Sequence, residues 1–197
     1  MKKLLKISVL VLVIIASYYV WHVHFNYRFE EISKDKVYKS ALIKDRDKME
    51  SLLVGNNIKT VIDLLDPGVQ NLLNPAKQKE IDTEDRYIKE INKKHNLNIQ
   101  HINIPSGQVP NKENLEKFLK VLDDKSNYPV LIHCYHGTGR AQIYSAIYRL
   151  EYEQWKNEDA RQKTRFMVEG FGYRSSFADG KEKGDFLMNY KPRSSEK

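Results

Sequence analysis

The sequence contains only one cysteine, Cys134, among 197 residues. A lone cysteine cannot form an internal disulfide, so the fold has to be stable without one, and Cys134 needs a packing or a chemical reason. With 41% hydrophobic and 30% charged residues, the chain can bury a core without such help. Its length leaves room for one globular domain and a short appendage.

Motifs that combine aromatic and basic residues for nucleic-acid binding are also missing. The formal net charge is +7, which favours anionic partners. Lysines and arginines are nevertheless spread along the chain and mixed with acidic residues, as in Lys89-Glu90, and a solvated basic surface explains this pattern. We find no internal repeat and no low-complexity segment. We expect a monomer with no nucleic-acid partner and no cofactor.

The N-terminus carries a long apolar run. Leu4 to Val23 holds a single lysine, Lys6, near its start and is long enough to cross the hydrocarbon core of a bilayer as a helix. Aromatic side chains occur at its far end, where a membrane interface would lie, at Tyr18, Tyr19 and Trp21. A cleaved signal peptide is the rival interpretation, but no small-x-small cleavage site follows the run. We therefore predict an uncleaved transmembrane anchor.

Three segments follow from this prediction. They are a membrane anchor over residues 1–24, a juxtamembrane linker over 25–36 and a catalytic domain over 37–197. Lys2 and Lys3 precede the apolar run, which favours an N-terminus inside the cell and a domain outside the cytoplasm, in the periplasm. Basic residues also follow the run and weaken this charge asymmetry: Arg28, Lys34, Lys36 and Lys39.

Beyond the linker, short β-branched runs alternate with segments whose apolar residues recur at helical spacing. The predicted strands are Val37–Ser40, Thr60–Leu65, Ile99–Ile104 and Pro129–His133. The predicted helices are Asp45–Leu53, Glu80–Lys94, Leu115–Leu122, Ile143–Leu150, Asn157–Glu169 and Gly184–Tyr190. Gly55 is expected to end the first helix in the left-handed conformation. Such alternation predicts an α/β fold with a central, mostly parallel sheet flanked by helices.

A distinctive segment, Cys134 to Arg140, follows the most apolar strand and precedes an amphipathic helix. In such folds ligands bind at the carboxyl ends of the strands. Gly137 and Gly139 allow a tight turn in which successive backbone N–H groups point at one spot, and the following helix adds the positive end of its dipole. Arg140 can present a planar fork to two phosphate oxygens. A cysteine at this focus ionises readily and can attack phosphorus.

The pattern His-Cys-x-x-Gly-x-x-Arg resembles the signature loop of the protein tyrosine phosphatase superfamily, and the chain looks like its small dual-specificity branch, of a bacterial, membrane-anchored kind. The resemblance covers roughly residues 37–155. It is carried by the loop and by its flanks, Val37-Tyr38-Lys39-Ser40-Ala41, Lys59-Thr60-Val61-Ile62-Asp63-Leu64 and Tyr128-Pro129-Val130-Leu131-Ile132-His133. It implies a phosphatase with Cys134 as nucleophile, Arg140 as phosphate clamp and His133 as the buried support of the loop. The phosphate-binding loop would be Tyr135, His136, Gly137, Thr138, Gly139 and Arg140.

The sequence departs from that family at two places. Ala141 stands where members usually carry Ser or Thr, whose hydroxyl eases departure of the cysteine thiolate. The stretch Ile102–Pro110, where the family places its general-acid Asp, contains no carboxylate. Asp66 is the best candidate for that acid because it ends a strand at the same edge of the sheet, although an Asp before Pro-Gly is more commonly a turn residue.

Several functions remain open on the sequence alone. The first is a cysteine-dependent phosphatase acting on phosphotyrosine or another phosphate monoester of a protein or small molecule. The second is a pseudophosphatase that binds phosphorylated partners without turnover, which Ala141 favours. Redox or arsenate chemistry would call for further cysteines. A metal site at His133, Cys134 and His136 is disfavoured because neighbours on a strand point to opposite faces, and we expect no metal.

Overall fold

The computed structural model describes residues 2–68, 74–75, 77–170 and 175–193, so Met1 and 194–197 of the expected segments lie outside the described residues. A five-stranded sheet in the order β1-β2-β5-β3-β4 forms the centre of the domain. The strands are β1 (Glu30–Ser33), β2 (Val37–Ala41), β3 (Thr60–Asp63), β4 (Gln100–Asn103) and β5 (Val130–Cys134). All neighbouring pairs are parallel except β1 with β2. The predicted α/β fold with a mostly parallel sheet is confirmed.

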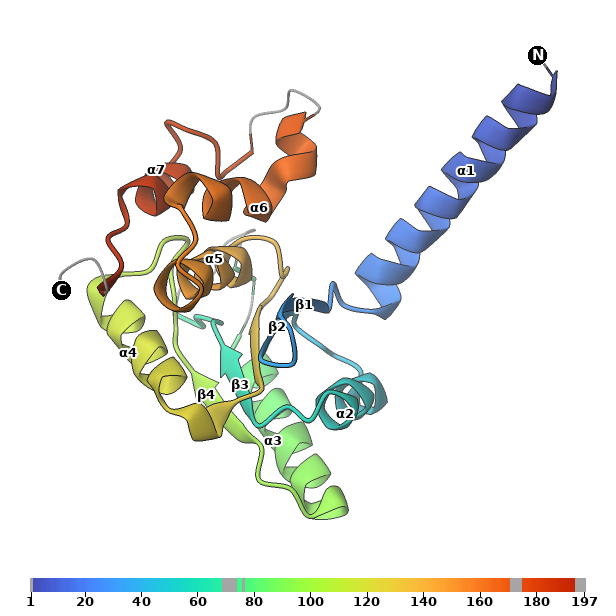
Figure 1. Ribbon diagram of the computed structural model, residues 1–197. Coiled ribbons are helices and arrows are strands. Elements are labelled where there is room, and N and C mark those ends of the chain that lie inside the picture. Colours follow the sequence, from blue (N-terminus) through green and yellow to red (C-terminus); the bar gives the residue numbers. More distant parts are fainter. Residues whose placement is uncertain (1, 69–73, 76, 171–174, 194–197) are drawn as a thin grey trace.

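Helices cover both faces of the sheet (Figure 1). On one face α2 (Arg46–Gly55) and α3 (Gln78–His95) pack against side chains that include Val61 and Leu131. On the other face α4 (Lys112–Asp123) and α5 (Arg140–Tyr152) pack against Ile62 and Ile132. Successive strand residues therefore point to opposite faces, as the two-residue period of a strand requires. A short 3₁₀ turn (Lys125–Asn127) follows α4, and α6 (Asn157–Gly170) and α7 (Glu182–Asn189) follow α5.

The expected linker over residues 25–36 contains a strand, β1, that pairs antiparallel with β2. The sequence of β1, with two glutamates in four residues, carries no alternation that would predict a strand. Its place is fixed instead by the open edge of β2. Glu30 lies opposite Lys39, and their charged groups are 2.7 Å apart, with the lysine side chain almost completely buried.

The end of α2 differs from the prediction that Gly55 stops it in the left-handed conformation. Gly55 is the last helical residue, and the left-handed residue is Asn57, with φ 52°. The amide N–H groups of Asn57 and Ile58 donate to the carbonyls of Val54 and Leu53, which closes the helix in a Schellman motif. Asparagine tolerates this conformation better than other non-glycine residues, so the helix can run two residues further.

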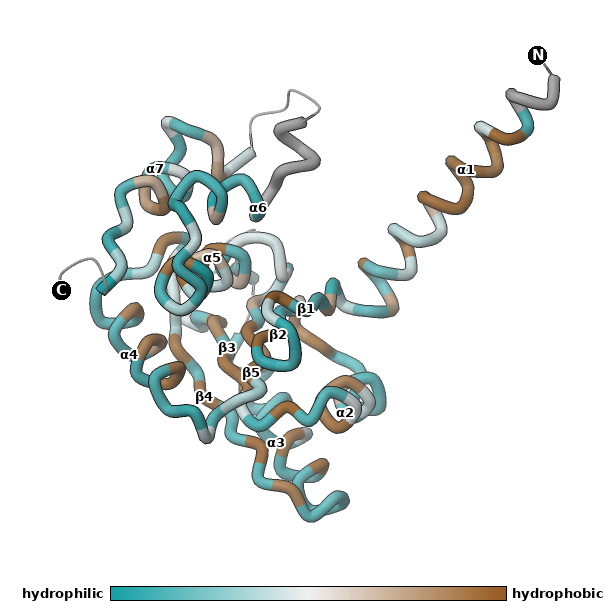
Figure 2. The backbone as a smooth tube through the Cα atoms, in the orientation of Figure 1, coloured by the Kyte–Doolittle hydropathy of each residue, from teal (hydrophilic) through white to brown (hydrophobic). Residues whose placement is uncertain are grey.

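Helix α1 (Lys2–Val20) continues into a π-helical turn over Trp21–Phe25 and stands away from the domain (Figure 1). It is apolar over much of its length (Figure 2), and none of the stretch Lys6–Phe25 is buried against the protein. The stretch has the length and composition of a membrane span, and a signal sequence near an N-terminus has the same properties. The N-terminal apolar helix is thus present.

Candidate active site

The loop that follows β5 lies at the carboxyl edge of the parallel sheet. Cys134 is the last residue of β5 and pairs in register with Ala41 of β2, while His133 pairs with Asp63 of β3. Arg140 is the first residue of α5, so the loop connects the central strand directly to a helix N-terminus. This is the strand-loop-helix arrangement that the sequence predicts for an anion-binding site.

Gly137 fixes the shape of the loop around the sulfur. Its backbone N–H donates to Sγ of Cys134 at 3.3 Å, and the cysteine is 2% exposed. Gly137 has φ +69°, and a Cβ at this position would lie only 2.6 Å from the backbone nitrogen of Ala41. Both the conformation and the close approach of β2 therefore require glycine here.

Arg140 is 2% exposed, and its side chain makes three hydrogen bonds to residues outside the loop. Its Nη1 donates to the carbonyl of Leu64, just after β3, and to the carbonyl of Ser106 at 3.3 Å. Its Nη2 donates to Oδ1 of Asn74 at 2.6 Å. All three acceptors are uncharged, so they fix the position of the guanidinium and leave its positive charge unpaired by any of these contacts.

Three other loop residues contact their surroundings in different ways. The hydroxyl of Tyr135 accepts a hydrogen bond from Nζ of Lys44 at 2.9 Å. The carbonyl of His136 accepts one from Nη1 of Arg28 at 2.9 Å, and the His136 residue is exposed. Thr138 is half-buried. Because Arg28 belongs to the segment that joins α1 to β1, this hydrogen bond connects the loop after β5 to the part of the chain nearest the apolar helix.

The stretch 102–110, which contains no carboxylate, approaches the same loop. It supplies hydroxyl and amide groups there. The buried Ser106 hydroxyl lies 2.8 Å from the hydroxyl of Tyr144. Oε1 of Gln108 accepts a hydrogen bond from Nζ of Lys183 at 2.7 Å. Lys183 lies on α7, is 8% exposed, and its Nζ would be 3.1 Å from a Cβ added to Gly139. The sequence alone did not indicate this lysine, since a single Lys far along the chain carries no motif.

Asp66 makes the turn that its Pro-Gly context indicates. One carboxylate oxygen accepts a hydrogen bond from the N–H of Gly68 at 2.9 Å, and the backbone carbonyl of Asp66 accepts one from Nδ2 of Asn74 at 2.7 Å. Asn74 also contacts Arg140. Asn74 thus connects the backbone of Asp66 to the guanidinium of Arg140. The role of Asp66 as general acid stays a prediction.

His133 is buried in a cluster of ionisable groups behind the strand. Its Nε2 lies 2.9 Å from Oε2 of Glu84 and 3.7 Å from Oδ1 of Asp63, and Nε2 of His101 lies 3.2 Å from the same Glu84 oxygen. Burial alone would lower the pKa of His133, but Glu84 and Asp63 outweigh it and raise this pKa to about 9. Burial raises the pKa of Asp63.

The spacing of apolar residues in Glu80–Lys94 predicts a buried helical stripe of Ile81, Tyr87, Ile88 and Ile91, which does not include Glu84. Glu84 is 3% exposed, whereas Tyr87 is only half-buried. A signal was present, because position 84 lies three residues after Ile81 and four before Ile88 and so falls on the same helical face. A carboxylate on an apolar stripe needs a buried partner.

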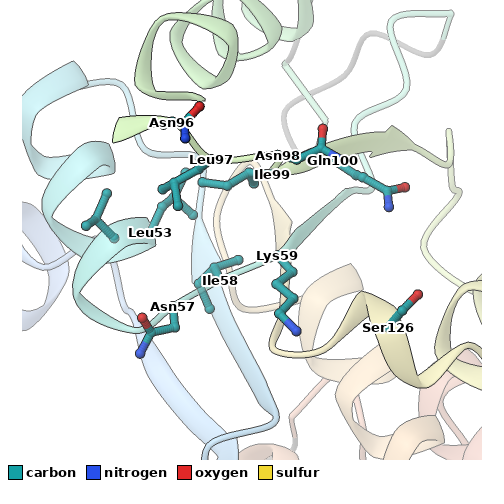
Figure 3. A pocket seen from close by; sticks show the side chains of 11 residues that line it. Leu53, Asn57, Ile58, Lys59, Asn96, Leu97, Asn98, Ile99, Gln100 and Ser126 are labelled. Carbon is teal, nitrogen blue, oxygen red and sulfur yellow. The ribbon is translucent and has the colours of Figure 1, made fainter. Parts of the chain in front are cut away.

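A hollow of about 530 Å³ lies at the opposite edge of the sheet. Its lining combines apolar side chains such as Leu53, Ile58 and Leu97 with polar ones such as Lys59 and Gln100 (Figure 3). Ile58 and Lys59 precede β3, and Gln100 begins β4, so the hollow faces the amino ends of the strands. It is therefore separate from the loop that holds Cys134.

Comparison with known families identifies the class of protein. Residues 45–178, more than half of the chain, match the family described as "DSP-PTPase phosphatase fused to NAD+ Kinase". The chain belongs to this family of phosphatases, and the resemblance to the protein tyrosine phosphatase superfamily is confirmed. No curated protein matches the sequence.

Solved structures of phosphatases share the fold at low sequence identity. The core catalytic domain of the PP-IP phosphatase SIW14 from S. cerevisiae is 16% identical, with a TM-score of 0.59 over 85% of this chain and 88% of that one. TpbA from P. aeruginosa is 18% identical, with a TM-score of 0.57 over 84% and 86%. A putative phosphatase from Shewanella putrefaciens is 19% identical, with a TM-score of 0.54 over 81% and 87%.

Proposed function

We propose that the protein is a membrane-anchored, cysteine-dependent phosphatase that hydrolyses phosphate monoesters through a phosphocysteine at Cys134. The observation that carries this proposal is the loop itself. The N–H of Gly137 donates to Sγ of Cys134, and Arg140, whose guanidinium is buried, is the first residue of the helix that the loop leads into. Backbone amides, a helix N-terminus and an arginine together suit the equatorial oxygens of a phosphoryl group.

The reaction would proceed in two displacements. The sulfur of Cys134 attacks phosphorus, the bond from phosphorus to the ester oxygen breaks, and the leaving oxygen takes up a proton. Water then attacks the phosphocysteine, the S–P bond breaks, and inorganic phosphate leaves. Arg140 and the loop amides stabilise the charge on the transferred group in both steps. Asp66 is the candidate proton donor of the first step.

The substrate class that we propose is phosphotyrosine or another phosphoprotein. A variant of TpbA with 18% identity to this chain has been solved in complex with pTyr. Strongly acidic phosphoinositides would favour lysines in the loop. Residues 135–139 contain none. An aryl phosphate also has a good leaving group, which needs a general acid least.

The test is hydrolysis of an aryl phosphate and of a phosphotyrosine peptide by the full chain purified in detergent. We expect turnover that vanadate inhibits, its loss in Cys134→Ser, and a severe loss in Arg140→Lys, because an ammonium cannot replace the planar fork. Cys134→Ser should keep its circular dichroism spectrum and its affinity for the peptide. Unchanged turnover in Cys134→Ser would show that Cys134 is not the nucleophile.

A pseudophosphatase is the second candidate, because Ala141 provides no hydroxyl and Gln108 occupies the stretch where an acid would be expected. In that case the wild-type protein would bind the phosphotyrosine peptide in an Arg140-dependent manner and release no phosphate. A burst of one leaving group per chain without further turnover would instead identify a trapped phosphocysteine.

A further inference from the structure

Four ionisable side chains from four different elements meet on the face of the sheet that α3 covers. Val61 and Leu131 pack against α2 and α3, so Asp63 and His133, two residues further along the same strands, face α3 as well. His101 pairs in register with Val61 and shares this face. Glu84 reaches the same place from the buried stripe of α3.

The four groups lie close together but do not form the hydrogen bonds that their separations would allow. One ligand atom from each residue lies within 4.8 Å of all the others. Nε2 of His133 and Nε2 of His101 are 2.9 and 3.2 Å from Oε2 of Glu84, yet none of these three buried atoms makes a hydrogen bond.

We propose that Asp63, Glu84, His101 and His133 form a buried structural site for one divalent metal ion of the zinc type. Zinc holds imidazole nitrogens and carboxylate oxygens at about 2.0–2.2 Å in a tetrahedron, which places the ligand atoms about 3.4 Å from one another. The nitrogen-to-oxygen separations of the cluster are 2.9, 3.2, 3.7 and 3.8 Å. Ligand atoms at these separations can surround one common centre.

The charges of the cluster fit a divalent ion. Two carboxylates that are 0 and 4% exposed would, when both are ionised, place two negative charges in the protein interior, and burying them without compensation would be costly. One divalent cation with two neutral imidazoles gives a neutral site. Two hard oxygen and two imidazole ligands favour zinc over metals that prefer thiolates or all-oxygen shells.

Surrounding groups already orient Asp63, and a carboxylate lies near the second nitrogen of His101. Asp63 accepts hydrogen bonds from the N–H of Leu65 at 2.7 Å and from Nδ2 of Asn103 at 2.9 Å. Nδ1 of His101 lies 3.7 Å from Oδ1 of Asp85. Outer contacts of this kind hold metal-binding carboxylates and histidines in place. Nδ1 of His133 makes no hydrogen bond.

The site would stabilise the strand that carries Cys134 without taking part in the reaction. Cys134 packs with the cluster of side chains on the other face of the sheet, beneath α4 and α5. The ion would instead join α3 to β3, β4 and β5 directly behind the catalytic loop. The proposal is therefore independent of the phosphatase activity, and its test does not use it.

The experiment is metal analysis of the full chain, purified in detergent with a tag that does not bind metals. We expect one zinc per chain after dialysis, removal of the zinc by a strong chelator, and an upward shift in Tm of roughly 5–10 °C on adding back free zinc at a hundred times Kd. Cobalt(II) added to the stripped protein should give the intense visible absorption of a tetrahedral site.

Variants separate this site from adventitious binding. Glu84→Gln and His101→Gln should lose the metal and the Tm shift, whereas His95→Gln, an exposed histidine on the same helix, should keep both. Folded Glu84→Gln and His101→Gln proteins that still bind one zinc would overturn the proposal. So would a wild-type protein that shows neither the cobalt absorption nor the zinc-dependent Tm shift, a result that needs no variant and would mean that protons alone bridge the cluster.

Discussion

Three constraints meet at Gly137. Its backbone is left-handed, a Cβ added to it would lie 2.6 Å from the backbone nitrogen of Ala41, and its N–H donates to Sγ of Cys134. We expect Gly137→Ala to lower the free energy of unfolding by at least about 1–2 kcal/mol, the ordinary cost of the left-handed conformation for a residue with a Cβ. The activity should fall further, because the loop can relieve the contact with β2 only by moving the amide away from the sulfur. Chemical denaturation and aryl phosphate hydrolysis would measure the two effects.

Gly55 provides the matched control for that substitution. It is the last residue of α2, has no atom within 4 Å of an added Cβ and has no left-handed φ. Gly55→Ala should therefore leave activity unchanged and raise the free energy of unfolding by up to about 0.5–1 kcal/mol. If both substitutions had the same effect on stability and activity, the loop would not require glycine at position 137.

We expect Ala141 to affect the second displacement more than the first. It is completely buried directly after Arg140, where a hydroxyl could stabilise the departing thiolate. We expect rapid mixing of the wild-type protein with an aryl phosphate to give a burst of leaving group followed by slow turnover. Ala141→Ser should speed the slow phase by about tenfold or more, as a hydrogen bond to a charged group allows. If neither a burst nor a response to Ala141→Ser were observed, formation of the phosphocysteine would be the slow step.

At the scale of elements, the sequence was most informative where local pattern and burial agree. The run Val130–Cys134 is buried at every position, and the following glycine-containing loop and helix were predicted together from their order in the chain. Features that depend on distant partners could not be read in the same way. β1 exists because β2 has an open edge, and the acceptors of Arg140 come from Leu64, Asn74 and Ser106, which no spacing rule connects to it.

Helix α7 contributes Lys183 to the surroundings of the loop, which gives the C-terminal segment a candidate role in binding anionic substrates. We expect Lys183→Met, which keeps the length of the side chain, to lower kcat/KM for an aryl phosphate by about tenfold or more, mainly through KM. Lys181→Met is the control, because Lys181 is exposed just before the same helix. Equal activity of the two variants, both folded by circular dichroism, would exclude this role for the lysine.

For the whole molecule, the position of the apolar helix relative to the catalytic loop is the feature that matters most. The carbonyl of Tyr27 accepts a hydrogen bond from the N–H of Ala41, at the end of β2 that lies beside Cys134. Arg28 contacts the carbonyl of His136. If α1 spans a membrane, these two contacts place the catalytic loop at the end of the domain nearest that membrane, and substrates at or near the membrane surface would reach it most readily.

The last prediction concerns the side of the membrane on which the domain lies. Lys2 and Lys3 before the apolar run favour a domain outside the cytoplasm. An oxidising compartment threatens a reactive thiolate, but a chain whose only cysteine is Cys134 cannot trap it in an internal disulfide. We expect the protein to stay in the membrane fraction through a high-salt wash, and protease added to spheroplasts to degrade the domain. Protection until the membrane is lysed would reverse the orientation and make the substrates cytoplasmic. A soluble product beginning near Tyr19 would show that the apolar helix is a cleaved signal peptide.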